Sequence, residues 1–117
     1  MPSPTFHVSD HLEGKAPEVK AIYAVILETA KRLGPVEEDP KKTSIHLNRK
    51  TAFAGIATRK NGLLLTLKSA TDIASSRIAR RERASANRWH LEIKIEDPVQ
   101  VDRELAGWIK SAYELAG

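Results

Sequence analysis

Residues 51–69, TAFAGIATRKNGLLLTLKS, contain two apolar segments separated by a turn, and this stretch decides the fold. Asn61-Gly62 is the dipeptide most typical of a tight β-hairpin, because both residues tolerate the backbone angles of such a turn. Thr51–Thr58 has the composition of a strand, with Gly55 as a bulge or a point of close approach. Leu63–Leu67 is apolar on both faces, which is typical of a central strand. The stretch therefore predicts an antiparallel hairpin inside a sheet.

Upstream of this hairpin, the sequence predicts a long helix. Pro17 suits the first position of a helix, and apolar residues then recur every three or four positions as far as Leu33. Gly34 can take the backbone conformation that ends a helix. A shorter helix, capped by Ser9 or Asp10, is expected just before it. The first half of the helical layer thus consists of an N-terminal helix pair.

Three further segments have the patterns of strands. Residues 43–47 and 89–95 alternate between apolar and polar side chains, as a strand with one buried face does. Residues 36–39 could form a short edge strand, because Pro40 argues against a central position. Together with the central hairpin, these segments predict an antiparallel sheet of four to five strands.

The last third of the chain predicts a connection and a final helix. Residues 69–87 are rich in Ser, Ala and Arg and have no stable period, so a long connection with at most a helical turn is expected there. Asp97-Pro98-Val99-Gln100 has a capping Asp, a Pro at the first helical position and a Gln that can reach back. We therefore expect the C-terminal helix to begin at this point.

These elements predict a two-layer α+β domain, with the N-terminal helix pair and the C-terminal helix packed on one face of the sheet. Residues 9–117 form the single domain, and residues 1–8 are expected to be a loose N-terminal arm. The other face of the sheet is then open, and the outward strand positions are Ser44, His46, His90, Glu92 and Lys94.

The composition excludes several classes of function. The chain has no cysteine, which excludes disulfides, thiolate metal sites and cysteine nucleophiles. It has no glycine-rich phosphate loop and no nucleophile elbow, and its one histidine pair at helical spacing, His7 and His11, is interpreted as two incidental surface residues. We therefore expect no cofactor, no metal and a non-enzymatic role. The apolar runs are too short to span a bilayer and the N-terminus has no secretory pattern, so a cytoplasmic protein is expected.

The charge is concentrated in the middle of the chain, where residues 41–90 hold twelve Lys or Arg against two Asp or Glu. Guanidinium groups bind phosphate oxygens with two hydrogen bonds at any relevant pH. We therefore predict a binding surface for an anionic partner, most plausibly DNA or RNA, although a basic face kept for solubility is the plain alternative. The residues of this surface are Arg77, Arg80, Arg81, Arg83 and Arg88 of the arginine-rich connection, and Lys41, Lys42, Arg49, Lys50, Arg59 and Lys60 at the turns.

Two other functions stay open. Ser44, His46, His90 and Glu92 could line a small-molecule pocket or a hydrolase-like site on the open face, although two half-exposed histidines on a polar face are the simpler explanation. The chain could also be a protein-interaction or oligomerisation module. In that case the arginines would meet the acidic ends of a second copy, giving a homodimer.

The stretches PKKTSIHLNRKTAFAGIATRKNGLLLTLKS (40–69) and SANRWHLEIKIEDPVQVDRELAGWIKSAYELA (85–116) resemble a known bacterial family. This is the domain-of-unknown-function family 5655, some members of which carry the label "predicted transport protein". The resemblance runs from about Val8 to Leu115 and extends in general layout to the YdhG-like small domains. It implies an α+β domain that occurs alone or in larger proteins, including restriction and defence proteins, a context that favours nucleic acid.

The resemblance carries over no catalytic residue. Many relatives have a glycine-rich stretch before the last strand, where this chain has residues 84–90, ASANRWH. The resemblance therefore implies the fold more than a shared site.

Overall fold

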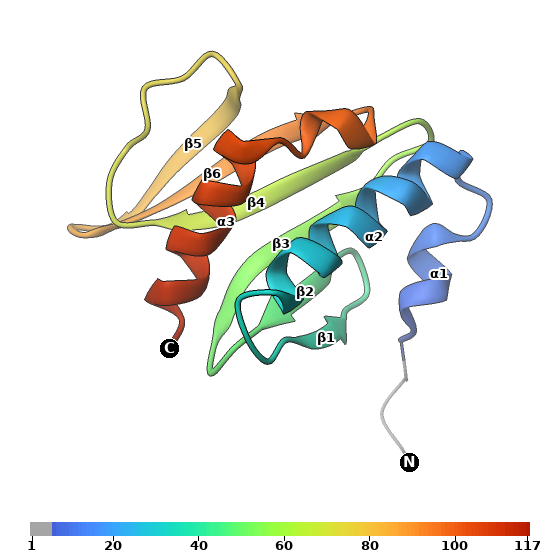
Figure 1. The fold of residues 1–117 in the computed structure, drawn as a ribbon, viewed down its shortest axis with the longest axis horizontal. Coiled ribbons are helices and arrows are strands. Elements are labelled where there is room, and N and C mark those ends of the chain that lie inside the picture. The colour runs from blue at the N-terminus through green and yellow to red at the C-terminus, as the bar shows by residue number, and fades with distance from the viewer. Residues whose placement is uncertain (1–5) are drawn as a thin grey trace.

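The computed structural model of the chain describes residues 6–117, so most of the expected N-terminal arm lies outside the described residues. Within them, three helices pack on one face of a six-stranded antiparallel sheet (Figure 1). The helices are α1 (Val8–Leu12), α2 (Pro17–Lys31) and α3 (Arg103–Leu115). The strands are β1 (Glu37–Pro40), β2 (Ile45–Asn48), β3 (Ala52–Thr58), β4 (Leu63–Ser69), β5 (Ile78–Ser85) and β6 (Arg88–Ile95), and they lie in the order β1-β2-β3-β4-β6-β5.

The predicted class, α+β with an antiparallel sheet, is confirmed, but the predicted count of four to five strands is wrong. The additional strand is β5, which lies inside the segment 69–87 that the sequence predicts to be a connection. β5 pairs with β6 along one edge of the sheet, from Ile78↔Ile93 to Ser85↔Arg88. Its residues do not alternate because seven of the eight are exposed, so neither face of this strand is buried against the core.

The N-terminal helix pair is unequal. α2 has fifteen residues and begins at Pro17 as predicted, whereas α1 has only five. α1 is preceded by His7 rather than capped by Ser9 or Asp10, and the Asp10 carboxylate accepts a hydrogen bond from the His7 N–H at 2.9 Å. Val8, expected in the arm, is therefore the first residue of α1.

The C-terminal helix begins later than predicted. The capping arrangement at Asp97 does form, since its side chain accepts from the Val99 N–H and the Gln100 side chain reaches back. It closes only one 3-10 turn (Pro98–Gln100), because Val101 leaves the helical conformation with ψ of 71°. Asp102 then caps α3 by accepting a hydrogen bond from the Leu105 N–H at 3.0 Å.

The core lies between the helices and one face of the sheet. β4 occupies the central position predicted for it, between β3 and β6. Phe53 of β3 meets Tyr113 of α3 edge to face, with ring centroids 5.3 Å apart. The fully buried large side chains come from both layers: Ile22, Ile26, Ile45, Leu47, Phe53, Ile56, Leu63, Leu65, Leu91, Ile93, Ile95 and Leu105. All three helices thus cover the same face, and within residues 6–117 no helix or strand covers the opposite face of the sheet.

Within residues 6–117 no helix combines the length and the apolar character needed to cross a membrane. The cytoplasmic location stays a prediction.

Candidate functional site

The strand register brings four outward-facing residues into one row across the open face. His46 of β2 pairs with Gly55 of β3, Gly55 pairs with Thr66 of β4, and Thr66 pairs with Glu92 of β6. Residues paired in this way point to the same side of an antiparallel sheet. The row therefore has an imidazole at one end, a carboxylate at the other, and a glycine without a side chain between them.

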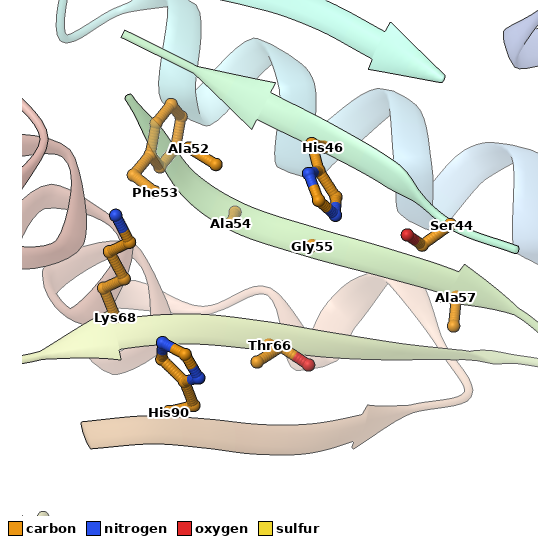
Figure 2. Close-up of a pocket in the computed structure, with 10 residues that line it drawn as sticks. All are labelled: Ser44, His46, Ala52, Phe53, Ala54, Gly55, Ala57, Thr66, Lys68 and His90. Atoms are coloured by element: carbon orange, nitrogen blue, oxygen red, sulfur yellow. The ribbon is translucent and has the colours of Figure 1, made fainter. Parts of the chain in front are cut away.

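A groove of about 310 Å³ runs along β3 where this glycine lies (Figure 2). Its lining is mostly apolar and contains no carboxylate among the described residues. The residues that line it are Ser44, His46, Ala52, Phe53, Ala54, Gly55, Ala57, Thr66, Lys68 and His90. The groove owes its depth to β3, since most of the residues that β3 contributes are glycine or alanine.

Gly55 differs from the glycines that the fold requires. A Cβ at Gly34 would collide with the Tyr113 hydroxyl, and one at Gly62 would lie 2.7 Å from the Ile95 carbonyl oxygen. A Cβ at Gly55 would meet only His46 Cδ2 at 3.8 Å and Thr66 Cβ at 4.0 Å, which are ordinary contacts. The backbone at Gly55 does not have a positive φ. Neither packing nor conformation therefore explains this glycine.

The two walls of the groove carry different groups. His46 belongs to the β2 wall, and Ser44 precedes β2 on the same side (Figure 2). Lys68 and His90 belong to the opposite wall and pair across β4 and β6. Both histidines were predicted to face this side, whereas Thr66 and Lys68 were missed. The polar positions in LLLTLKS could have indicated them, had Leu63–Leu67 not been interpreted as apolar on both faces.

The separation of the walls argues against a shared proton-transfer site. His46 and His90 lie on strands three spacings apart, which corresponds to roughly 14 Å between backbones. Glu92 lies on the same strand as His90 and in the register row of His46, but it too is three strand spacings away from β2. The hydrolase-like set is thus divided, because a general base has to be within hydrogen-bond reach of the proton that it takes.

The acidic neighbour of His46 is Asp39, its partner in the β1–β2 register. Lys41 lies 2.9 Å from the Asp39 carboxylate, and Asn48 donates a hydrogen bond to it at 3.4 Å. The hydrogen bond from Lys41 is the main reason why the pKa of Asp39 is lowered, with smaller contributions from Asn48 and His46. Asp39 is therefore engaged by Lys41.

A smaller hollow of about 120 Å³ adjoins the groove and shares Thr66 and His90 with it. Its other lining residues are Arg80, Glu82 and Glu92. Across the described residues, no three His, Asp or Glu side chains converge as metal ligands would.

Of the five predicted anion-binding arginines between residues 77 and 88, two are held by carboxylates of the same chain. Arg77 lies 2.9 Å from Asp102 and 3.1 Å from Glu104, and its guanidinium also lies over the Trp108 ring. Arg81 pairs with Asp72 at 2.8 Å. These two guanidinium groups are therefore engaged by acidic residues of the same molecule.

The other three arginines, Arg80, Arg83 and Arg88, form no ion pair within the described part of the chain. Arg83 donates to the Ser85 and Ala86 carbonyl oxygens, at 3.3 and 3.2 Å, and lies over the Trp89 ring. Arg88 donates to the Asn87 carbonyl oxygen at 2.9 Å. All three belong to the β5–β6 hairpin.

The basic residues at the turns are divided between the two ends of the sheet. Lys41, Lys42, Arg59 and Lys60 lie in the β1–β2 and β3–β4 turns, at one end of the antiparallel strands. Arg49 and Lys50 lie in the β2–β3 turn at the other end, which is also the end of the β5–β6 turn. Arg49 lies over the Tyr113 ring at 4.5 Å, and Lys41 is paired with Asp39. The predicted basic residues thus occupy separate regions, since alternate turns of a meander lie at opposite ends.

Comparison with known proteins gives one match. Residues 8–116 match the family model described as Domain of unknown function (DUF5655). No curated protein and no solved structure matches the chain significantly. The matched region includes every helix and strand of the domain, so the chain belongs to the domain-of-unknown-function family DUF5655.

Proposed function

We propose that the protein is a non-enzymatic binding module that takes a small anionic molecule with a flat apolar body into the groove on the open face of the sheet. The observation that carries this proposal is Gly55. A glycine inside a strand destabilises it by about 0.5–1 kcal/mol relative to alanine, so its presence needs a reason. At Gly55 that reason is the free space above the backbone, which lets a ligand approach the sheet closely.

The charge of the groove supports an anionic ligand. Lys68 forms no ion pair within residues 6–117, and no carboxylate is among the described residues that line the groove. An ammonium group next to apolar surface, with an imidazole beside it at His90, offers donors to a carboxylate or a phosphate. The volume lies at the lower end of the range for small-molecule sites.

The position of each group predicts the shape of the ligand. Lys68 and His90 lie near the Ala52 end of the groove, and Ser44 lies near Ala57 at the other end (Figure 2). The acidic group of the ligand would bind between Lys68 and His90. Its apolar body would lie on Gly55, and a polar atom at the far end would reach the Ser44 hydroxyl.

Nucleic acid and a homodimer, which the sequence predicts as partners, involve other surfaces. The acidic residues Asp102 and Glu104 belong to the C-terminal segment that the sequence offers as a partner for the arginines. In the folded chain they hold Arg77 of the same molecule. This internal pairing favours the groove over a charge-complementary dimer as the candidate function.

The test is a titration followed by amide chemical shifts, with benzoate, naphthoate and phenyl phosphate as probes and benzamide, naphthamide and phenol as neutral counterparts. We expect the anions to shift amides of β3, β4 and β6 around the groove at millimolar concentrations, and the neutral compounds to bind more weakly. Lys68→Gln should weaken anion binding roughly tenfold, which is about 1.4 kcal/mol. Gly55→Val should abolish binding while the protein stays folded.

The matched control is Lys94→Gln, which removes the same charge from the same face outside the groove. This variant should bind the anions within about twofold of the wild-type protein. Shifts that fall outside the groove, or an equal loss in the Lys68 and Lys94 variants, would refute the proposal.

A further inference from the structure

β5, the outer strand of the β5–β6 hairpin, is the most exposed strand of the sheet. Ile78 is the only buried residue of β5, and every residue from Ala79 to Ser85 is exposed. α3 packs over β3 and β4, and β5 has its main contact with β6 alone. The hairpin lies at the opposite side of the molecule from α1 (Figure 1). A strand that contributes one side chain to the core needs another explanation for its length.

The arginines of the hairpin point to both sides of the ribbon. Arg80 pairs with Glu92 in the register and therefore shares the open face of the sheet, whereas Arg83 pairs with Trp89 and shares the helix side. Arg88 lies at the turn, opposite Ser85. Because none of the three forms an ion pair within residues 6–117, their guanidinium groups can donate hydrogen bonds to an external anion.

Arg83 is also held in place. Two carbonyl oxygens of the turn, those of Ser85 and Ala86, accept from its guanidinium, and the Trp89 ring lies 5.8 Å from it. These contacts leave part of the guanidinium fork exposed and reduce the entropy that an arginine loses when it binds. The hairpin thus presents an ordered cation near its end.

From this arrangement we propose that the β5–β6 hairpin binds double-stranded nucleic acid through its phosphates. β6 is paired with β4 on its other side, so β5 and the turn form the free edge of the sheet, and Arg80, Arg83 and Arg88 along this edge can reach the phosphates of a duplex that lies against it. Guanidinium forks match phosphate oxygens, and such contacts give affinity without reading sequence. Base stacking on a single strand is disfavoured because Trp89, the aromatic residue of this hairpin, is covered by Arg83.

Two glutamates restrict where the phosphates can bind. Glu82 and Glu92 lie on the open face beside Arg80 and form no ion pair within the described chain. Their negative charge weakens the attraction of Arg80 for a phosphate. The strongest contacts with phosphate are therefore expected at Arg83, on the helix side of the hairpin, and at Arg88, at its turn.

The experiment is fluorescence anisotropy with a labelled duplex of about sixteen base pairs, titrated at several salt concentrations. The test variant combines Arg80→Gln, Arg83→Gln and Arg88→Gln, and the matched control combines Lys20→Gln, Lys31→Gln and Lys110→Gln on the helices. We expect the hairpin variant to bind at least about thirtyfold more weakly at low salt, and the control within about threefold of the wild type. The slope of log affinity against log salt should fall by about two in the hairpin variant, for the contacts of Arg83 and Arg88, and by less than one in the control.

A second variant separates charge from fold. Replacing the same three arginines with lysine keeps the charge, so binding should recover to within about tenfold of the wild type, and circular dichroism should show the native sheet in both variants. Equal losses in the hairpin and helix variants would show that only the bulk charge matters and would overturn the proposal. The same holds if the wild-type protein does not bind the duplex at low salt, or binds an acidic peptide more tightly. Since none of these arginines lines the groove along β3, either proposal can fail without the other.

Discussion

The guanidinium of Arg77 lies 2.9 Å from Oδ1 of Asp102, the same oxygen that caps α3 by accepting the Leu105 N–H. One carboxylate oxygen therefore joins the segment before β5 to the first turn of the last helix. Glu104, in the first turn of that helix, adds a second contact at 3.1 Å. An arginine that the sequence assigns to an external partner thus serves to attach α3.

We predict that Arg77→Gln lowers the free energy of unfolding by about 1–2 kcal/mol, because the carboxylates of Asp102 and Glu104 and the carbonyl oxygen of Gln100 lose a charged donor. Duplex binding should be unchanged. Urea denaturation monitored by Trp fluorescence measures the first effect. Arg103→Gln, an exposed change at the start of the same helix, is the control and should shift stability by less than about 0.5 kcal/mol. An unaltered midpoint for the Arg77 variant would contradict this assignment.

The two strand-associated glycines should respond in opposite ways to a methyl group. Gly55→Ala is expected to raise the free energy of unfolding by about 0.5–1 kcal/mol, because the unfolded chain loses freedom and the added Cβ meets only ordinary contacts. Gly62→Ala should lower it by about 1–3 kcal/mol, since its Cβ would lie 2.7 Å from the Ile95 carbonyl oxygen. The measurement is the thermal unfolding midpoint of each variant compared with that of the wild type. A destabilised Gly55 variant would mean that the glycine is structural.

Acid should destabilise the fold through Asp39 and Asp102. The pKa of Asp102 is lowered by the hydrogen bond from the Leu105 N–H and then by Arg77, and that of Asp39 chiefly by Lys41. Because both carboxyls are harder to protonate in the folded chain than in the unfolded one, their contribution to stability is present above about pH 4. It is lost as the pH falls through the lowered values.

The measurement is urea denaturation at about pH 6 and about pH 3. Asp102→Asn keeps a side chain that caps helices well but removes the charge, so its stability should change less between the two pH values than that of the wild type. An identical pH dependence in both proteins would exclude Asp102 as a cause.

Tyr23 of α2 donates a hydrogen bond to Oε2 of Glu38 in β1 at 2.6 Å. Burial, and then the nearby carboxylate, raise the pKa of Tyr23, so the phenol keeps its proton at ordinary pH. We expect Tyr23→Phe to cost about 1–2 kcal/mol, because the half-buried carboxylate loses its donor. A double-mutant cycle with Glu38→Gln, measured in urea, should give a coupling energy clearly different from zero. Additive effects would show that the contact contributes nothing.

The elements that the sequence predicts well are those that contribute many residues to the core. The apolar stripe of α2 and the alternation of β6 each record burial on a definite face, and the Asn61-Gly62 dipeptide lies in the loop that joins the core strands β3 and β4. β5 could not be predicted in this way, since its exposed residues follow no pattern and its conformation depends on pairing with β6. The strand is therefore a product of tertiary context.

The start of α3 shows a different limit of prediction from the sequence. Asp97 and Asp102 are both capping residues, five positions apart, and each is followed by residues that can form a helix. The first caps a single turn and the second caps the helix itself. Local sequence identifies both caps but does not decide between them, because the packing of Leu105 and Ile109 against the sheet determines where the long helix begins.

The candidate sites were predicted in part. Alternation places Ser44, His46 and His90 on the open face, where the groove contains them. Counting charges could not foresee that Arg77 and Arg81 would be paired with acidic residues of the same chain, since their partners lie up to 27 positions away. The pairing of distant charges is decided by the fold and not by local composition.

The near absence of core contacts in β5 has a consequence for how the molecule opens. The amide hydrogens that β5 donates to β6 are protected by this pairing alone, so they can exchange with solvent when the outer strand detaches for a moment, while the five remaining strands stay closed. The edge strand β5 therefore opens while the rest of the sheet stays folded. A partner that binds to β5 would slow this opening, and the protection factors of the β5 amides would rise when it binds.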